Sequence, residues 1–138
     1  KGVYGDFVCV KIGEKFGVVT KKGETVIAPT LQQKLDFNML NEFGLTPIKE
    51  DYRFGIINSE MKRVLNTEFR EVNLLKVYGR TYIIVGINLS FVLYDLEGNR
   101  ISQHSFYMWS YTTAGELFLH SEDYTFKLNE NGKLITDR

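Results

Sequence analysis

The chain of 138 residues is poor in several features that would define a function. Its single cysteine, Cys9, excludes an internal disulfide, and the alternating run around it favours a buried small hydrophobe over a reactive thiol. Lys plus Arg and Asp plus Glu both number 17, so the chain lacks the basic excess that nucleic acid binding requires. No apolar run approaches the ~20 residues of a membrane-spanning helix, so we expect no membrane insertion.

Patterns typical of catalysis and metal binding are also scarce. The two histidines, His104 and His120, have no Cys, Asp or Glu at metal-ligand spacing, and a zinc site needs three or four converging ligands. The sequence contains no nucleophile elbow and no glycine-rich phosphate loop. The acidic pairs Glu50-Asp51 and Glu122-Asp123 fall in expected turns, where solvated carboxylates are ordinary. We therefore expect no catalytic residue, no metal and no cofactor.

In contrast to these absences, a short glycine-containing β pattern occurs four times. Each copy has an apolar run led by phenylalanine, followed by a polar turn. The copies begin at Phe16, Phe54, Phe91 and Phe126. A second glycine precedes each copy by ten to twelve residues, at Gly5, Gly44, Gly79 and Gly115. Self-similarity at a period of roughly 20–50 residues indicates a repeat architecture.

We therefore predict a single all-β domain over residues 1–138, built from about four antiparallel hairpin or meander repeats. The expected units span residues 5–43, 44–78, 79–114 and 115–138. A curved open array of these units is favoured, and a closed or propeller-like barrel is the alternative. We expect each unit to end in an extended strand, although the tail from Leu31 to Phe43 also has helical spacing. The array is expected to be part of a longer one, or its ends pair to complete one unit.

Each tight turn has a recognisable chemistry. A short polar side chain opens the turn and can bond to nearby backbone, at Thr20, Asn58, Asp95 and Asn129. A glycine follows three residues later and can adopt a left-handed conformation, at Gly23, Gly98 and Gly132. The second copy has Met61 at this position, where a left-handed residue costs on the order of 1–2 kcal/mol. From this pattern alone, Met61→Gly is expected to stabilise the fold.

The repeat resembles the bacterial WG-repeat family, whose units combine an aromatic-glycine strand, a Lys-Gly turn and an Ile-Pro-Pro tail. The clearest copies are Phe16-Gly17-Val18-Val19 with Ile27-Ala28-Pro29, and Phe54-Gly55-Ile56-Ile57-Asn58. Phenylalanine replaces the tryptophan of the family, and Val92 replaces the motif glycine in the third unit. The resemblance implies an all-β array with a binding or scaffold role and no catalytic site. It also implies an envelope or secreted location ahead of a cytoplasmic one.

One aromatic segment, His104 to Tyr111, departs from the repeat. In a strand, Tyr107, Trp109 and Tyr111 share one face, and Phe106 lies on the other. Such a strand is either buried on both faces or offers an aromatic strip to a partner. Tyr and Trp are enriched at binding surfaces, so these three residues are the candidate ligand-binding site. The motif phenylalanines are the expected repeating core: Phe16, Phe54 and Phe91.

Three functions remain open from the sequence. The favoured one is a non-enzymatic β-repeat module that binds a protein partner through an extended surface. The second is recognition of a carbohydrate or the cell wall through the aromatic strip. The third is an enzyme whose site is scattered over loops and is not visible in the sequence.

Overall fold

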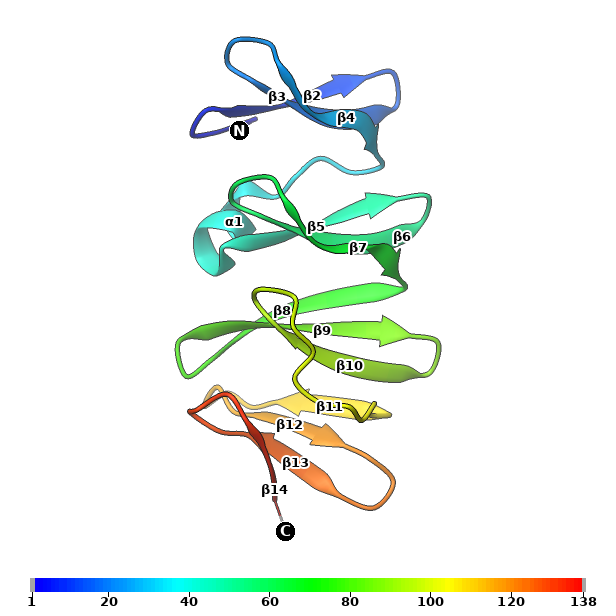
Figure 1. Cartoon of the computed structure of the whole chain (residues 1–138), viewed down its shortest axis with the longest axis vertical. Helices are drawn as coiled ribbons and strands as arrows, with labels where there is room; N and C mark the ends of the chain where they lie inside the picture. The colour runs from blue at the N-terminus through cyan, green and yellow to red at the C-terminus, as the bar shows by residue number, and fades with distance from the viewer. Residues whose placement is uncertain (1, 138) are drawn as a thin grey trace. The chain divides into compact units, whose positions relative to one another are not determined.

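The computed structural model describes residues 2–137, which are mostly β-strand with one short helix (Figure 1). The described residues contain fourteen strands, and these pair into four antiparallel sheets. Every sheet joins strands that follow one another along the chain. The expected open all-β architecture is confirmed, and the strands between residues 2 and 137 form no closed barrel.

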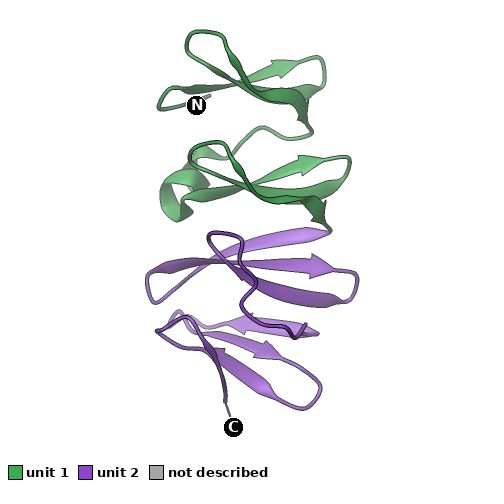
Figure 2. Cartoon of the chain, in the orientation of Figure 1, with its two compact units in different colours: residues 1–69 green, residues 70–138 purple. Residues whose placement is uncertain are grey.

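The chain divides into two compact units, residues 1–69 and 70–138 (Figure 2). Unit 1 contains sheets A and B, with one helix between them in the chain. Sheet A has strands β1 (Val3–Tyr4), β2 (Phe7–Ile12), β3 (Lys15–Thr20) and β4 (Thr25–Leu31), in that order. Helix α1 spans Phe37–Phe43. Sheet B has strands β5 (Leu45–Glu50), β6 (Arg53–Asn58) and β7 (Arg63–Phe69), in that order.

Unit 2 contains sheets C and D. Sheet C has the order β10-β9-β8, with β8 (Glu71–Val77), β9 (Arg80–Ile87) and β10 (Ser90–Asp95). Sheet D has strands β11 (Met108–Tyr111), β12 (Leu117–His120), β13 (Thr125–Leu128) and β14 (Leu134–Thr136), in that order. An irregular segment between β10 and β11 returns to sheet C at Phe106, which exchanges two backbone hydrogen bonds with Phe91, of 2.7 and 2.9 Å.

The tails of the repeats differ from the expected strands in two places. After β4, residues 37–43 form helix α1, so the helical spacing in this tail was the better guide. The carboxylate of Asp36 accepts hydrogen bonds from the backbone N–H groups of Asn38 and Met39, and Gly44 ends the helix in a left-handed conformation. The second difference is β8, which pairs with β9 in sheet C instead of closing sheet B.

The tight turns follow the predicted chemistry. The backbone N–H groups two and four residues after Asn58 donate to its side-chain oxygen, at 2.9 and 3.1 Å. The same pair of bonds forms at Thr20, Asp95 and Asn129. A fifth copy, which the sequence pattern did not identify, lies between β11 and β12, where the N–H of Glu116 donates to the hydroxyl of Thr112 at 3.0 Å. Gly115 is therefore the left-handed residue of a loop, unlike the two-residue turn at Gly79.

Met61 has a φ of 65°, so it adopts the left-handed conformation that glycine has in the equivalent turns. Its side chain is only 6% exposed and lies in the core cluster of unit 1. Burial of a methionine side chain contributes more than the left-handed backbone costs. The structure therefore reverses the direction expected for Met61→Gly.

The aromatic-glycine pair has a packing reason. A Cβ atom on Gly17 would lie 2.6 Å from the carbonyl oxygen of Ile27, and one on Gly55 would lie 2.6 Å from that of Leu65. At both glycines the pairing with the next strand shifts register, in β4 and in β7. Val92 takes this position in sheet C, where β10 is followed by the irregular segment instead of a long paired strand.

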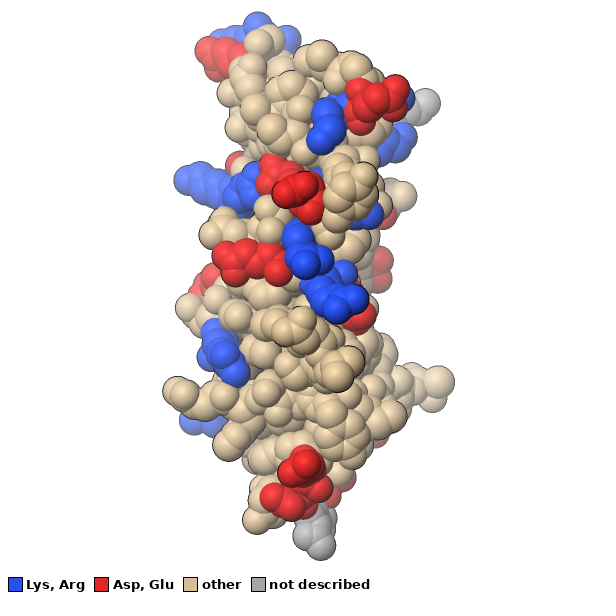
Figure 3. All heavy atoms as spheres, turned by 90° about the vertical axis from the view of Figure 1, so that its right-hand side faces the viewer, with Lys and Arg blue, Asp and Glu red and all other residues tan. Residues whose placement is uncertain are grey.

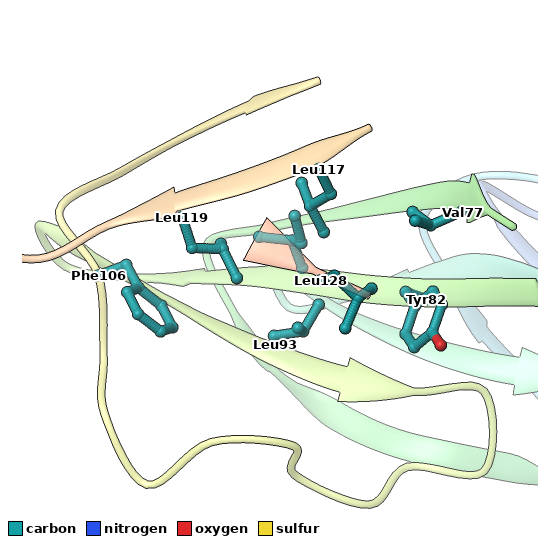
Figure 4. Close-up of a cluster of buried hydrophobic side chains, with 8 residues drawn as sticks. Val77, Tyr82, Leu93, Phe106, Leu117, Leu119 and Leu128 are labelled. Atoms are coloured by element: carbon teal, nitrogen blue, oxygen red, sulfur yellow. The ribbon is translucent and has the colours of Figure 1, made fainter. Parts of the chain in front are cut away.

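Each unit has its own hydrophobic core. In unit 1 it combines residues of both sheets, of helix α1 and of two connecting loops: Val18, Leu31, Leu35, Leu40, Ile48, Ile57 and Met61. Cys9 packs against this cluster. In unit 2 the core lies between sheets C and D (Figure 4): Val77, Tyr82, Ile84, Leu93, Phe106, Leu117, Leu119 and Leu128. The motif phenylalanines Phe16, Phe54 and Phe91 are half-buried, and Phe16 and Phe91 pack against the cores of their own units.

Candidate functional site

The aromatic segment of the sequence lies along β11, an edge strand of sheet D. It is not buried on both faces, because Tyr107 is 58% exposed and Tyr111 is 41% exposed. Phe106, which precedes them, is fully buried in the core of unit 2. The segment is thus anchored at Phe106 and opens to solvent immediately afterwards.

The three predicted ligand-binding residues do not form one continuous strip. Trp109 is half-buried and packs against the core of unit 2, opposite Leu119 in the strand register. The hydroxyl of Tyr111 donates a 2.6 Å hydrogen bond to the backbone carbonyl of Lys76 in β8. Tyr107 lies before β11, at the other end of the strand from Tyr111. Only Tyr107 keeps both an exposed ring and a hydroxyl without a described partner.

An open hollow lies beside Tyr107, at the turn between β12 and β13 (we call it the tyrosine hollow). Its wall is formed by two tyrosines, three carboxylates and two hydroxyl side chains: Tyr107, Tyr124, Glu122, Asp123, Asp137, Ser121 and Thr125. A second open hollow shares Ser121 to Tyr124 with it and also includes His104 and Phe126. It therefore combines exposed aromatic rings with acceptor oxygens.

Local sequence explains how this turn is built. The backbone N–H and the hydroxyl of Ser121 both donate to the carbonyl oxygen of Tyr124, at 2.9 and 3.2 Å, and the N–H of Tyr124 donates back to the hydroxyl. These bonds close a tight hairpin with Glu122 and Asp123 at its tip. On the far side, the N–H of Asp137 donates to the carbonyl of Thr125 at 2.7 Å. These bonds bring the three carboxylates to one end of sheet D, where β12 and β14 end.

Phe126 is the aromatic ring that contacts the other rings beside the hollow. The centroid of Phe126 lies 5.7 Å from that of Phe106 in an edge arrangement, 6.2 Å from that of His104 and 6.1 Å from that of Tyr124. Such pairs are worth about 0.5–1.5 kcal/mol each beyond their buried area. Phe126 therefore fixes Tyr124, which stays 51% exposed.

The hollow is acidic, because three carboxylates line it. In the lower part of Figure 3, where unit 2 is seen, uncharged side chains predominate and acidic ones gather near the C-terminal end. Among the described residues that line the hollow there is no Lys or Arg. Glu122 and Asp123 have no ion-pair partner between residues 2 and 137. A positively charged group would find acceptors here without competing for an internal pair.

Two ion pairs elsewhere are internal to the fold. The Glu50 carboxylate accepts from the Arg63 guanidinium at 2.9 Å and from the hydroxyls of Thr30 and Thr67, and the hydrogen bond from Arg63 contributes most to lowering its pKa to about 2. Glu50 was expected to be a solvated turn residue, and the structure shows instead a carboxylate that joins three strands. In sheet D, the hydrogen bond to Glu116 raises the pKa of Lys127.

Sequence reasoning missed Tyr124. The Ser-x-x-Tyr turn before Phe126 was a usable signal, since a serine that closes a turn places the fourth residue at its base. In the described part of the chain, no three His, Cys, Asp or Glu side chains are grouped so that they could hold a metal ion. No helix within residues 2–137 is long and apolar enough to cross a membrane.

Comparison with known proteins reveals little similarity in sequence or structure. No family model matches the chain, and no curated protein matches it. A search of solved structures found similarity to a crystal structure of a protein of unknown function from Bacteroides caccae, with 10% sequence identity and a TM-score of 0.33. The match covers 96% of this chain, which spans 57% of the length of that protein.

Proposed function

We propose that this chain is a non-enzymatic β-repeat module that binds a protein partner, and that the tyrosine hollow of unit 2 receives a basic segment of that partner. The observation that carries the proposal is the placement of Tyr107 and Tyr124, 58% and 51% exposed, beside the carboxylates of Glu122, Asp123 and Asp137. Aromatic faces and carboxylates together attract Lys and Arg side chains.

The repeat architecture supports a binding role. Repeats of this kind present hairpin turns on a regular scaffold, and loops on a rigid scaffold commonly carry recognition. The hydrogen bonds of the Ser121–Tyr124 turn order this wall of the hollow before any ligand arrives, which lowers the entropy lost on binding.

The environment of the carboxylates favours binding over catalysis. Glu122 and Asp123 lie at the tip of an exposed turn, open to solvent. Closed active sites exclude water from the reacting groups, and an exposed turn tip does not.

Carbohydrate recognition is the second candidate, because sugar rings stack on tyrosine and sugar hydroxyls donate to carboxylates. The partial burial of Trp109 and the engagement of Tyr111 with Lys76 leave Tyr107 and Tyr124 as the stacking surfaces. A neutral glycan would depend on the rings more than on the charges.

The test is titration of the intact chain with a short Lys- and Arg-containing peptide, with an acidic peptide of equal length and with neutral oligosaccharides. Chemical shifts of the backbone amides around residues 121–125 report binding. We expect the basic peptide to bind, and Tyr124→Ala and the double change Glu122→Gln, Asp123→Asn each to weaken it about tenfold or more.

Tyr52→Ala is the matched control, because Tyr52 is 72% exposed on a turn of unit 1, outside the hollow. It should leave the affinity unchanged. Binding of oligosaccharides alone would favour the second candidate. If neither class of ligand binds, or if Tyr124→Ala leaves the affinity of the basic peptide unchanged, the proposal is wrong.

We also propose that the repeats are degenerate members of the WG-repeat type. The support is that the aromatic-glycine pair and the left-handed turn residue each have a structural role in sheets A and B. Phe16 and Phe54 are half-buried, so Trp at either position should fit. Phe16→Trp and Phe54→Trp should each change the free energy of unfolding by less than about 1.5 kcal/mol, and a larger loss would count against the relation.

A further inference from the structure

A second pocket lies in unit 2, apart from the tyrosine hollow, and we call it the arginine pocket. Its walls come from the start of β9, the segment that follows β10 and the loop between β13 and β14. Both sheets of unit 2 therefore contribute to it. Its volume is about 300 Å³, at the lower end of the range for small-molecule sites. The arginine pocket and the tyrosine hollow have no described lining residue in common.

Tyr82 of β9 lines the arginine pocket from a buried position. The residue is 4% exposed, and its ring belongs to the core of unit 2. In Figure 4 its hydroxyl lies at the end of the ring that points away from Leu93 and Leu128. The hydroxyl has no hydrogen-bond partner within residues 2–137, and no fully buried side-chain oxygen there lacks a partner. The hydroxyl therefore opens on the pocket, where a ligand can reach it.

Two hydrogen-bond donors converge on a spot beside Gly132. A Cβ atom on Gly132 would lie 3.1 Å from the hydroxyl oxygen of Tyr82 and 3.2 Å from Nη1 of Arg80. At Gly23, which has the same turn position in sheet A, a Cβ atom would meet nothing within 4 Å. Gly132 thus leaves open a spot that any side chain would fill, and both donors face that spot.

The arginine pocket has charges of both signs that do not pair with each other. Arg80 forms no ion pair in the part of the chain that the structure describes. Two carboxylates line the wall, and that of Asp95 accepts hydrogen bonds within its own loop, from the N–H groups of Glu97 and Asn99. The carboxylate of Glu97 has no partner within residues 2–137. The guanidinium of Arg80 and the carboxylate of Glu97 are therefore both available to a ligand.

We infer that the arginine pocket binds a free α-amino acid with an apolar side chain. The carboxylate of this ligand accepts hydrogen bonds from the guanidinium of Arg80 and the hydroxyl of Tyr82, at the open spot beside Gly132. A guanidinium suits a carboxylate because its parallel N–H groups match the two oxygens. A phosphate dianion is a poorer match, because the carboxylates of Asp95 and Glu97 line the same pocket.

The rest of the ligand is selected by the opposite charge and by the apolar part of the wall. The ammonium group of the amino acid pairs with the carboxylate of Glu97, and its side chain packs on Leu96 and Ile101. Leu96 is 44% exposed, so an apolar ligand removes part of its surface from water. The C-terminus of a peptide has a carboxylate but no ammonium group beside it, and it leaves Glu97 unpaired. A free amino acid uses both charges.

The experiment is a titration of the intact chain with leucine, followed by the backbone amide chemical shifts of residues 80–82, 95–97 and 131–132. N-acetyl-leucine, which lacks the ammonium group, leucinamide, which lacks the carboxylate, and inorganic phosphate are titrated in parallel. Leucine should bind with a Kd below about 5 mM. Each of the other three compounds should bind at least about tenfold more weakly, because each loses a charge-assisted contact or adds a repulsive one.

Two variants test the donors and the open spot. Tyr82→Phe keeps the buried ring and removes only the hydroxyl, so it should weaken leucine binding about threefold to tenfold. Gly132→Ala fills the spot and should abolish binding. Gly23→Ala is its matched control, because it strains the same turn position in unit 1 and leaves the pocket unchanged. Circular dichroism verifies folding, and Tyr82→Phe serves if Gly132→Ala fails to fold.

Absence of a saturable shift up to about 50 mM leucine overturns the inference. Equal affinity for leucine and any of the three other compounds also overturns it, because the pocket would then not recognise both charges of an amino acid. Unchanged affinity in the folded Tyr82→Phe protein, or equal losses in Gly132→Ala and Gly23→Ala, does the same. Shifts confined to residues 121–125 would place leucine in the tyrosine hollow and overturn the assignment to this pocket.

Discussion

At the residue scale, the loops depend on one left-handed position and one short polar side chain. Four of the five loops of this type in residues 2–137 have glycine at the left-handed position, with φ between 80° and 92°. The fifth has Met61, whose side chain reaches the core of unit 1. Burial of this side chain offsets the cost of the left-handed backbone, so backbone strain and core packing oppose each other at one residue.

Met61→Gly should therefore destabilise the protein by about 1–3 kcal/mol. Loss of a buried methionine costs about 2–5 kcal/mol, and relief of the left-handed conformation returns about 1–2 kcal/mol. Urea unfolding, followed by circular dichroism, measures the difference. Met61→Leu keeps the burial and should change stability by less than about 1.5 kcal/mol. A more stable Met61→Gly protein would show that the backbone term is the larger one.

The second residue-scale prediction concerns Gly55, where a Cβ atom would lie 2.6 Å from the carbonyl oxygen of Leu65 and 2.8 Å from the carbonyl carbon of Asn66. Backbone cannot move away as a flexible side chain can, so Gly55→Ala should cost about 1–3 kcal/mol. Gly2→Ala is the matched control, because its Cβ atom would meet its nearest neighbour, the oxygen of Cys9, at an ordinary 3.5 Å. Equal melting temperatures for the two variants would contradict the close-approach explanation.

At the element scale, Glu50 joins three strands of unit 1. It lies at the end of β5 and accepts hydrogen bonds from Thr30 of β4 and from Arg63 and Thr67 of β7. Its side chain is 18% exposed, and that of Arg63 is 39% exposed. The carboxylate therefore links sheet A to sheet B inside one unit, and its charge is required for the full set of bonds.

This linkage predicts an acid-sensitive stability. The pKa of Glu50 falls from 4.5 to about 2 on folding, so the folded state binds its proton more weakly than the unfolded state does. Its contribution is complete above about pH 4.5 and is lost as the pH falls towards 2. After allowance for the exposed Arg63, we expect a loss on the order of 1–2 kcal/mol. Glu50→Gln should flatten the fall in melting temperature between pH 5 and pH 2, and an unchanged pH profile would contradict the assignment.

The elements that local patterns control were predictable from the sequence. The hairpin loops at Thr20, Asn58, Asp95 and Asn129 form as predicted, because their hydrogen bonds involve only five consecutive residues. The structure of the tail after β4 was not predictable, because its sequence fits both a helix and a strand. Capping by Asp36 and Gly44 favours the helix. The partner of β8 was not predictable either, because strand pairing depends on tertiary register and not on local propensity.

The candidate site was only partly visible. Exposure of Tyr107 and Tyr111 was one of two alternatives left open by the sequence. The sequence could not show that the Tyr111 hydroxyl bonds to Lys76, 35 residues away, or that Trp109 turns towards the core. Contacts between residues far apart in the chain decide which aromatic rings remain exposed to solvent. Local sequence patterns do not predict such contacts.

At the scale of the whole molecule, every sheet is made from consecutive strands. Loops that join paired strands are short, so little chain entropy is lost before each contact forms. All-β proteins dominated by distant pairings fold in milliseconds to seconds, and local pairings fold faster. We expect the main refolding phase to finish within about 10 ms, measured by stopped-flow fluorescence of Trp109 after dilution from urea. A single main phase of seconds would show that long-range docking limits folding.

The five loops closed by a polar side chain also have a consequence for how such chains diversify. Each loop satisfies its own hydrogen bonds and returns the strand in the same register, whichever of Thr, Asn or Asp begins it. The four loops with glycine at the left-handed position should therefore be interchangeable: the five residues of one can replace those of another without a change of strand register, whereas the loop that contains Met61 also contributes to the core of unit 1. If the repeats arose by gene duplication, the strand sequences could diverge while these loops stayed alike. The loops are then suitable segments to exchange between hairpins in protein design.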